Sequence, residues 1–246
     1  MDKAHYRRLV WNMLEDKKAA LPPYPVHGRI PNFINAEKAA SLLASLDEWK
    51  NARVVKVNPD SPQRWVRMNA LREGKVLIMP TPRIMDGFLI LEGVDAIKAS
   101  TIRGAFMHGR RLGSIDELLK SIKHIDLIVE GSVAVNVYGE RLGKGEGYGE
   151  LEFAILRELE IVDADVPIAT TVHDLQVLND RLPQDPYDVQ IDIIATPTRL
   201  IRAHRRWYRP SGIIWHMLSN EKFMGIPLLQ ELICRVEKER NVSNLT

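Results

Sequence analysis

The chain has 246 residues, of which 45% are apolar and 27% charged, and these fractions exclude a protein that is disordered over most of its length. Because 34 Lys and Arg face 32 Asp and Glu, the formal charge of +2 excludes a polycation that coats nucleic acid or membrane along its whole surface. The single cysteine, Cys234, excludes an intrachain disulfide and a cysteine-bound structural zinc. A charged start and the lack of a long apolar run predict a cytoplasmic protein without a membrane span.

The first predicted element is an amphipathic helix from Asp2 to about Lys18. Its apolar residues recur at steps of three and four, as the stripe of a helix that packs on a core does: Tyr6, Leu9, Val10, Met13 and Leu14. The basic residues Lys3 and Arg7 lie one turn apart on another face of this helix.

A proline-rich stretch from Leu21 to Pro31 must be extended or turned. Asn35 then stands where a side chain caps a helix, which we expect from about Ala36 to Leu46. A strand at 53–57, a helix at 61–73 and a strand at 76–79 follow, and this order is typical of a βαβ unit.

The second half of the chain continues the alternation of strands and helices. Ser114-Ile-Asp-Glu117 is a capping box that opens a short helix ending near Lys120. Strands are expected at 125–129, 166–172 and 191–195, with a helix at 151–159. Short apolar strands between amphipathic helices predict a three-layer α/β/α fold with a mostly parallel, Rossmann-like open sheet, whose site lies beyond the carboxyl ends of the strands.

The segment after Thr198 differs from the rest. We expect one α/β domain over 1–202 and a basic arm with a final helix, at about 228–239, over 203–246. Arginine beside aromatic residues can bind RNA. The alternative, an arm that packs its aromatics on the domain, is favoured because basic stretches of this length are common on surfaces. The residues concerned are Arg199, Arg202, Arg205, Arg206, Trp207, Tyr208 and Arg209.

The segment that carries most chemical information is the glycine-rich run 139–149. Glycines at alternate positions, 143, 145, 147 and 149, permit positive φ and close approach, so their amides can form a nest for phosphate oxygens. A helix N-terminus follows, Arg141 and Lys144 add positive charge, and Glu150 can hold a metal ion on the phosphates. A flexible surface loop is the open alternative. The run is neither a Walker A loop nor a Rossmann fingerprint.

Residues 131–148, Gly-Ser-Val-Ala-Val-Asn-Val-Tyr-Gly-Glu-Arg-Leu-Gly-Lys-Gly-Glu-Gly-Tyr, resemble the central motif of the 5-formyltetrahydrofolate cyclo-ligase family. Further segments resemble that family in the same order: Lys3 with Arg7, Asp60-Ser-Pro-Gln63 ahead of Gly74-Lys75, and Pro183 to Asp192. Segments 28–33 and 103–109 are similar to a divergent branch found in archaea and in methenyltetrahydrofolate synthase domain-containing proteins.

The resemblance implies ATP-dependent conversion of 5-formyltetrahydrofolate to 5,10-methenyltetrahydrofolate, ADP and phosphate. It implies ATP and Mg²⁺ as cofactors and only small-molecule partners, in a monomer or homodimer; membrane or nucleic-acid partners are not expected. The site residues that it implies are Lys144, Arg141 and Tyr148 for catalysis, Lys3, Arg7, Gly143, Gly145, Gly147 and Gly149 for the nucleotide, Asp60 and Tyr148 for the folate, and Glu150 and Asp188 for the metal.

The sequence departs from the family motif at several positions. Gly149 and Glu150 replace the second Tyr and the Asp, Asp60 replaces a Glu, Val135-Asn136 replaces Phe-Asp, and Tyr187 replaces a His. The loss of an aromatic ring at 149 removes a stacking surface for a ligand. Two other functions therefore stay open: a catalytically silent nucleotide- or folate-binding protein, and an RNA-binding protein that uses the arginine-rich arm.

Two aspartates permit a structural interpretation as well. Asp188 closes a proline-bounded loop, where a metal ligand or a turn-stabilising side chain fits. For Asp192, inside a predicted strand, pairing with a nearby basic residue is the favoured interpretation.

Overall fold

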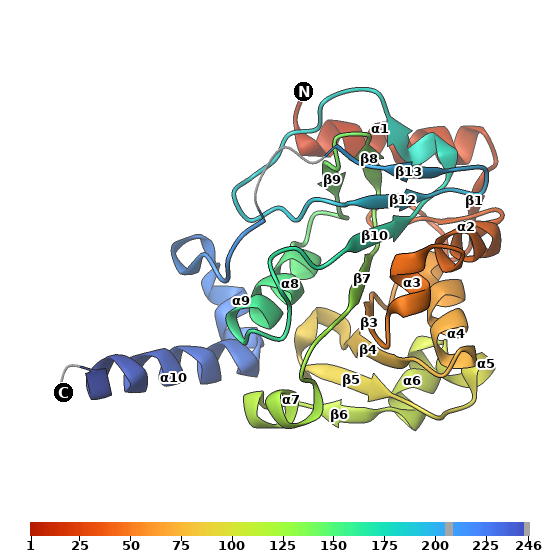
Figure 1. Cartoon of the computed structure of the whole chain (residues 1–246). Coiled ribbons are helices and arrows are strands. Elements are labelled where there is room, and N and C mark those ends of the chain that lie inside the picture. The colour runs from red at the N-terminus through yellow and green to blue at the C-terminus, as the bar shows by residue number, and fades with distance from the viewer. Residues whose placement is uncertain (205–208, 244–246) are drawn as a thin grey trace.

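The computed structural model describes residues 1–204 and 209–243 and contains an eight-stranded sheet between two layers of helices (Figure 1). The strands have the order β13-β12-β10-β7-β3-β4-β5-β6. From β12 to β4 neighbouring strands are parallel, whereas β13, β5 and β6 pair antiparallel. Their bounds are Val54–Val57 (β3), Val76–Pro80 (β4), Phe88–Leu91 (β5), Arg110–Leu112 (β6), Leu127–Glu130 (β7), Ile168–Thr171 (β10), Ile193–Ala195 (β12) and Leu200–Arg202 (β13). The predicted three-layer, mostly parallel α/β fold is confirmed.

The parallel strands are buried on both faces because their side chains alternate between two apolar clusters. In β3, Val55 and Val57 pack on one face, and in β4 Leu77 and Met79 do the same. Ile78 packs into the cluster on the opposite face. Burial on both faces explains why these strands read as continuous apolar runs in the sequence.

Helices cover both faces of the sheet. One layer contains α2 (Ala36–Ala44), α3 (Asp47–Asn51), α4 (Arg64–Arg72), α5 (Ala96–Ala99) and α6 (Ile102–His108), whose buried residues join the cluster with Val55. The other layer contains α7 (Ile115–Ser121), α8 (Tyr148–Glu158) and α10 (Pro227–Ser243), which bury residues such as Phe153 in the cluster with Ile78. The short α9 (Asn220–Gly225) precedes α10.

Helix α1 (Lys3–Asp16) packs on a second, three-stranded sheet of order β11-β8-β9. Its strands are β8 (Ala134–Asn136), β9 (Arg141–Leu142) and β11 (Val177–Leu178). The buried face holds Tyr6, Val10, Trp11 and Leu14. The expectation that Leu9 belongs to this face is wrong, since Leu9 is 42% exposed. The buried stripe extends toward Trp11 on one side of the helix, and Leu9 lies on the other side.

The proline-rich stretch is bracketed by a short antiparallel pair, β1 (Ala20–Leu21) and β2 (Asn32–Phe33). Asn35 stands at the start of α2, but it does not cap the helix as predicted. Its backbone is left-handed, with φ 61°, and its side chain makes no capping hydrogen bond. The capping box of α7 is confirmed: Ser114 Oγ accepts from the Glu117 amide at 3.3 Å, and Glu117 Oε2 accepts from the Ser114 amide at 3.1 Å.

Three parts of the chain differ from the sequence-based expectation. The helix expected at 61–73 begins with a 3₁₀ turn, Ser61–Gln63, and continues as α4 from Arg64. The antiparallel strands β5 and β6, with α5 and α6 between them, were not predicted: β6 is largely basic, and the apolar run of β5 was overlooked. The final helix begins at Pro227, one residue before its expected start.

The C-terminal segment packs on the same core as the main domain. Arg209 is buried: its Nε donates to Gln190 O at 3.1 Å, its Nη1 donates to Val166 O at 2.6 Å, and it forms an ion pair with Asp192. The predicted structural role of Asp192 is confirmed. Ile213 and Leu229 extend the main apolar cluster. Residues 205–208 of the arginine-rich segment lie outside the described residues.

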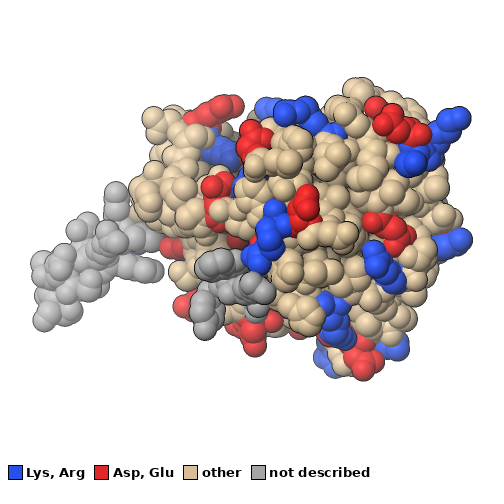
Figure 2. Space-filling model, turned by 90° about the horizontal axis from the view of Figure 1, so that it is seen from above, with Lys and Arg blue, Asp and Glu red and all other residues tan. Residues whose placement is uncertain are grey.

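Acidic and basic side chains are interspersed over the face of the molecule shown in Figure 2, in keeping with the small net charge. Among the described residues, no helix is long and apolar enough to cross a bilayer.

The packing of α10 predicts that Leu229→Ala lowers the free energy of unfolding by about 2–5 kcal/mol, because a fully buried leucine leaves a cavity. Urea unfolding followed by circular dichroism measures the change. The control Met224→Ala removes a side chain that is 70% exposed and should change stability by less than about 0.5 kcal/mol. Equal effects of the two variants would show that α10 does not contribute to the core.

Candidate active site

The topology of the large sheet places a crevice between β3 and β7. The chain passes from β3 to its neighbour β4 on one side and later returns to β7 on the other side of β3. Connections that leave in opposite directions open a crevice beyond the carboxyl ends of the two strands. Asn58 and Asp60 follow β3 at this edge, and Gly131 follows β7.

The glycine-rich loop joins β9 to α8 above this crevice. Of the four alternate glycines, only Gly145 and Gly147 have positive φ, at 108° and 70°. Helix α8 begins at Tyr148, three residues before its predicted start, and Gly147 occupies the N-cap position. Gly149 and Glu150 therefore lie in the first turn of the helix rather than in the loop, which corrects the expectation of a nest formed by all four glycines.

Arg141 and Glu150 form an ion pair at the base of this loop, and both side chains are at most 10% exposed. Arg141 also donates two hydrogen bonds to Gly131 O, from Nε at 3.1 Å and from Nη2 at 2.8 Å. Burial opposes the charge of Arg141, but Glu150 and Glu130 outweigh it and raise the pKa of the guanidinium. Burial likewise opposes ionisation of Glu150, yet Arg141 keeps the pKa of that carboxyl below its usual value. Both groups are therefore charged at neutral pH.

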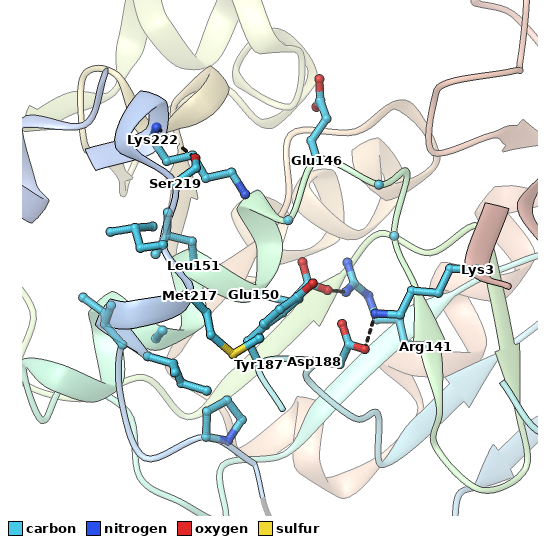
Figure 3. Close-up of a pocket in the computed structure, with 18 of the residues that line it drawn as sticks. Lys3, Arg141, Glu146, Glu150, Leu151, Tyr187, Asp188, Met217, Ser219 and Lys222 are labelled. Carbon is cyan, nitrogen blue, oxygen red and sulfur yellow. Dashed lines mark hydrogen bonds and ion pairs between the residues drawn. The ribbon is translucent and has the colours of Figure 1, made fainter. Parts of the chain in front are cut away.

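A first cavity of about 370 Å³ opens on one side of the loop (Figure 3). It collects predicted nucleotide and metal residues from distant parts of the chain: Lys3, Arg7, Arg141, Gly143, Gly145, Gly147, Glu150 and Asp188. Lys3 pairs with Asp188, and its Nζ lies 2.7 Å from Asp185 Oδ2. Arg7 Nε donates to Gly143 O at 2.7 Å. Burial lowers the pKa of Arg7.

Asp188 has the turn-stabilising role that was considered for it, and its role as a metal ligand stays a prediction. Its Oδ2 accepts from the Asp185 amide at 2.6 Å, which stabilises the turn, and the same carboxylate faces Lys3 in the cavity. Burial raises the pKa of Asp188, against the opposing effect of Lys3.

A second cavity of about 590 Å³ opens on the other side of the loop. It is lined by Asp60, Lys144, Tyr148 and Gly149, together with proline and isoleucine side chains of the bracketed stretch. Lys144 and Gly149 thus lie apart from the cavity of Lys3 and Arg7. Lys144 Nζ forms an ion pair with Glu146 at 2.8 Å. Among the described residues, the Asp60 carboxylate has no hydrogen-bond or ion-pair partner, and burial raises its pKa.

The two cavities meet beneath the loop. Arg141, Glu150 and Gly147 line both of them, so the Arg141–Glu150 pair forms part of the partition between the cavities. A ligand in each cavity would have this ion pair in common.

Sequence reasoning missed a buried charged network beside the second cavity. Lys56 Nζ lies 2.6 Å from Glu130 Oε1 and 2.6 Å from Glu152 Oε2, and all three side chains are at most 6% exposed. Burial, followed by the nearby Glu130 charge, raises the pKa of Glu152 to about 7 despite Lys56. Glu152 and Asn58 line the cavity. A lysine in the middle of an apolar strand was the available signal, because a buried lysine needs a carboxylate partner.

The described residues contain no group of three or more His, Cys, Asp or Glu side chains that could hold a metal ion. Mg²⁺ is usually bound by one or two carboxylates and by the phosphates of a substrate. Glu150 and Asp188 supply two carboxylates in the first cavity and fit that mode of binding.

The chain is similar to several known proteins. A model of the 5-formyltetrahydrofolate cyclo-ligase family matches residues 1–197. A methenyltetrahydrofolate synthase domain-containing protein of Mus musculus is 40% identical over 236 residues, 94% of this chain and 63% of the mouse protein. Its namesake in Homo sapiens is 37% identical over 243 residues, 97% of this chain and 63% of the human protein. An NMR structure of Aquifex aeolicus 5,10-methenyltetrahydrofolate synthetase has a TM-score of 0.52 at 23% identity and covers 89% of this chain and 100% of its own.

The Aquifex aeolicus structure shares the fold, an open α/β sheet with helices on both faces. The match over residues 1–197 shows that the chain belongs to the 5-formyltetrahydrofolate cyclo-ligase family. The resemblance to methenyltetrahydrofolate synthase domain-containing proteins is confirmed, and the chain spans about 63% of the length of the mouse and human relatives.

The raised pKa of Glu152 predicts a pH-dependent cost to stability. A carboxyl that titrates near pH 7 in the folded chain and near 4.5 when unfolded destabilises the fold progressively as pH rises between these values. Glu152→Gln cannot ionise, so its melting temperature should rise relative to that of the wild type between pH 5 and pH 8. Thermal denaturation at each pH measures this. The melting temperature of the exposed control Glu37→Gln should differ from that of the wild type by the same amount at every pH. A difference for Glu152→Gln that does not change with pH would contradict the prediction.

Proposed function

We propose that the chain is an ATP- and Mg²⁺-dependent ligase that converts 5-formyltetrahydrofolate to 5,10-methenyltetrahydrofolate, ADP and phosphate. Membership of the cyclo-ligase family supports this reaction. The observation that carries the proposal is the pair of cavities that meet at Arg141 and Glu150, because phosphoryl transfer between two small substrates needs two sites with a common charged boundary.

The first cavity takes ATP. Lys3, Arg7 and Arg141 present positive charge, and the loop amides and the start of α8 add partial charges of the same sign. Phosphoryl transfer depends mainly on positioning and on cations around the transferred group. Glu150 and Asp188 would hold the Mg²⁺ ion, which neutralises phosphate charge when bound.

The second cavity takes the folate. Asp60 lines the cavity and its carboxyl can form hydrogen bonds with the pterin, while Tyr148 supplies an aromatic side chain. Lys144 extends from the loop on this side, where it can stabilise negative charge that passes from ATP to the formyl group.

The reaction balances in two steps. The formyl oxygen attacks the terminal phosphorus of ATP, an O–P bond forms, and the bond to the departing ADP breaks. The neighbouring amine nitrogen then attacks the activated formyl carbon and loses its proton; the C–O bond breaks and phosphate leaves. The proposed role of Arg141 is to stabilise the transferred group during the first step, and its position in the lining of both cavities supports this role.

Gly149 favours a second candidate function. It lines the folate side at the position where the family has a tyrosine ring, so a catalytically silent nucleotide- or folate-binding protein is the alternative. An RNA-binding function is less favoured, because Arg199, Arg202 and Arg209 pair with acidic residues of the chain itself.

The two-cavity assignment predicts that two variants separate the substrates. Arg7→Gln should raise the KM for ATP about tenfold and leave that for 5-formyltetrahydrofolate unchanged, since a charge-assisted contact is worth about 1.5–3 kcal/mol. Asp60→Asn should do the reverse. Formation of the methenyl chromophore measures turnover, and the exposed control Lys38→Gln should behave as the wild type.

Two results would distinguish the ligase from the silent binder and from the RNA-binding protein. ATP binding without ADP release in the presence of the formyl-folate would support the silent binder and overturn the ligase. An affinity for RNA that falls steeply as the salt concentration rises would support the RNA-binding function, because contacts with phosphates release counterions.

A further inference from the structure

The wall of the first cavity opposite α1 is built by residues 210–222, which follow the part of the chain that the family model matches. This segment is held in place by buried contacts. Arg209, at its start, forms an ion pair with Asp192, and the Ile213 amide donates to Glu158 Oε2 at 3.0 Å. Ile226 and Leu229, at its end, are buried in the main core. This side of the cavity is therefore formed by a segment that the core holds in place.

Lys222 is the cation of that wall, and Figure 3 shows it on the opposite side of the cavity from Lys3. It lies close to the glycine loop: a Cβ placed on Gly147 would be 2.8 Å from its Nζ. The Nζ also lies 5.2 Å from the centre of the Tyr148 ring.

Among the described residues, no carboxylate lies within ion-pair distance of Lys222, whereas Lys3 and Arg141 on the other side both have acidic partners. Burial lowers the pKa of Lys222, although Glu150 and Glu146 oppose that shift. A half-buried ammonium without a fixed counter-ion, facing a cavity lined by other cations, is suited to an anionic ligand.

The rest of this wall is apolar. Ile213, Ile214, Met217 and Leu218 line the cavity together with Leu151 and Ala154 of α8. A flat heteroaromatic ring packs well on such a surface, and the sulfur of a methionine makes favourable contacts with rings. The segment thus offers a cation for phosphates and an apolar surface for a base.

We propose that Lys222 binds the phosphate chain of the nucleoside triphosphate and that the side chains at 213–218 cover its base. This inference rests on the proposed function, in which the first cavity holds ATP. It assigns one wall of the nucleotide site to residues 210–222, which follow the part of the chain that the family model matches.

The test is isothermal titration calorimetry of the full chain with ATP and, separately, with inorganic tripolyphosphate. Lys222→Gln should weaken both ligands about tenfold, as the loss of one charge-assisted contact does. Lys222→Arg should retain most of the affinity. Met217→Asp should weaken ATP but much less tripolyphosphate, which has no base. The exposed control Lys38→Gln should change neither, and thermal denaturation confirms that each variant is folded.

The outcomes distinguish this inference from the proposed function. If the wild type binds ATP and Lys222→Gln binds it equally well, Lys222 is not a phosphate ligand and the inference is wrong, while the ATP site stands. If Met217→Asp weakens both ligands equally, the apolar wall does not cover the base. If the wild type binds neither ligand, both the inference and the nucleotide site of the proposed function are wrong.

Discussion

The buried ion pair between Arg141 and Glu150 is the interaction on which the rest of the site depends. Arg141 comes from β9 and Glu150 from the first turn of α8, so their pairing closes the glycine loop that lies between them. Arg141 also ties the loop to the sheet through Gly131 O at the end of β7. Removal of Arg141 would leave the buried Glu150 carboxylate without its ion-pair partner, which costs about 3–5 kcal/mol. Removal of Glu150 would leave Arg141 with Glu130 at 3.5 Å as its acidic partner.

The ion pair leaves no room for a side chain at Gly149. A Cβ on Gly149 would lie 2.9 Å from Glu130 Oε2 and 3.1 Å from Arg141 Nη2, so a larger side chain in the same backbone position would displace one of these groups. Glu130 in turn pairs with the buried Lys56. The glycine that replaces the second tyrosine of the family motif is therefore coupled to a charged network in the sheet. A tyrosine at this position would require Glu130 or Arg141 to move.

The charged side chains differ between the two cavities. The first cavity has cations from α1, β9 and α9, each brought from a distant part of the sequence. The second cavity has the open Asp60 carboxyl and the side chains of the proline-rich stretch. Arg141 and Glu150 line both cavities, so a ligand in either one would lie beside the same ion pair.

The sequence by itself determined the layered α/β fold, the amphipathic α1 and the position of the glycine loop, because periodicity, capping residues and glycine content are local properties of the chain. The resemblance to the family motif also predicted one common site for five residues that line the first cavity: Lys3, Arg7, Arg141, Glu150 and Asp188. Only the tertiary structure decided that Lys144 and Gly149 face the second cavity, that Glu130 and Glu152 surround Lys56, and that Lys222 completes the first cavity. The direction of a side chain at a loop depends on how the loop packs between α8 and the sheet, and contacts between segments more than 70 residues apart leave no local pattern to read.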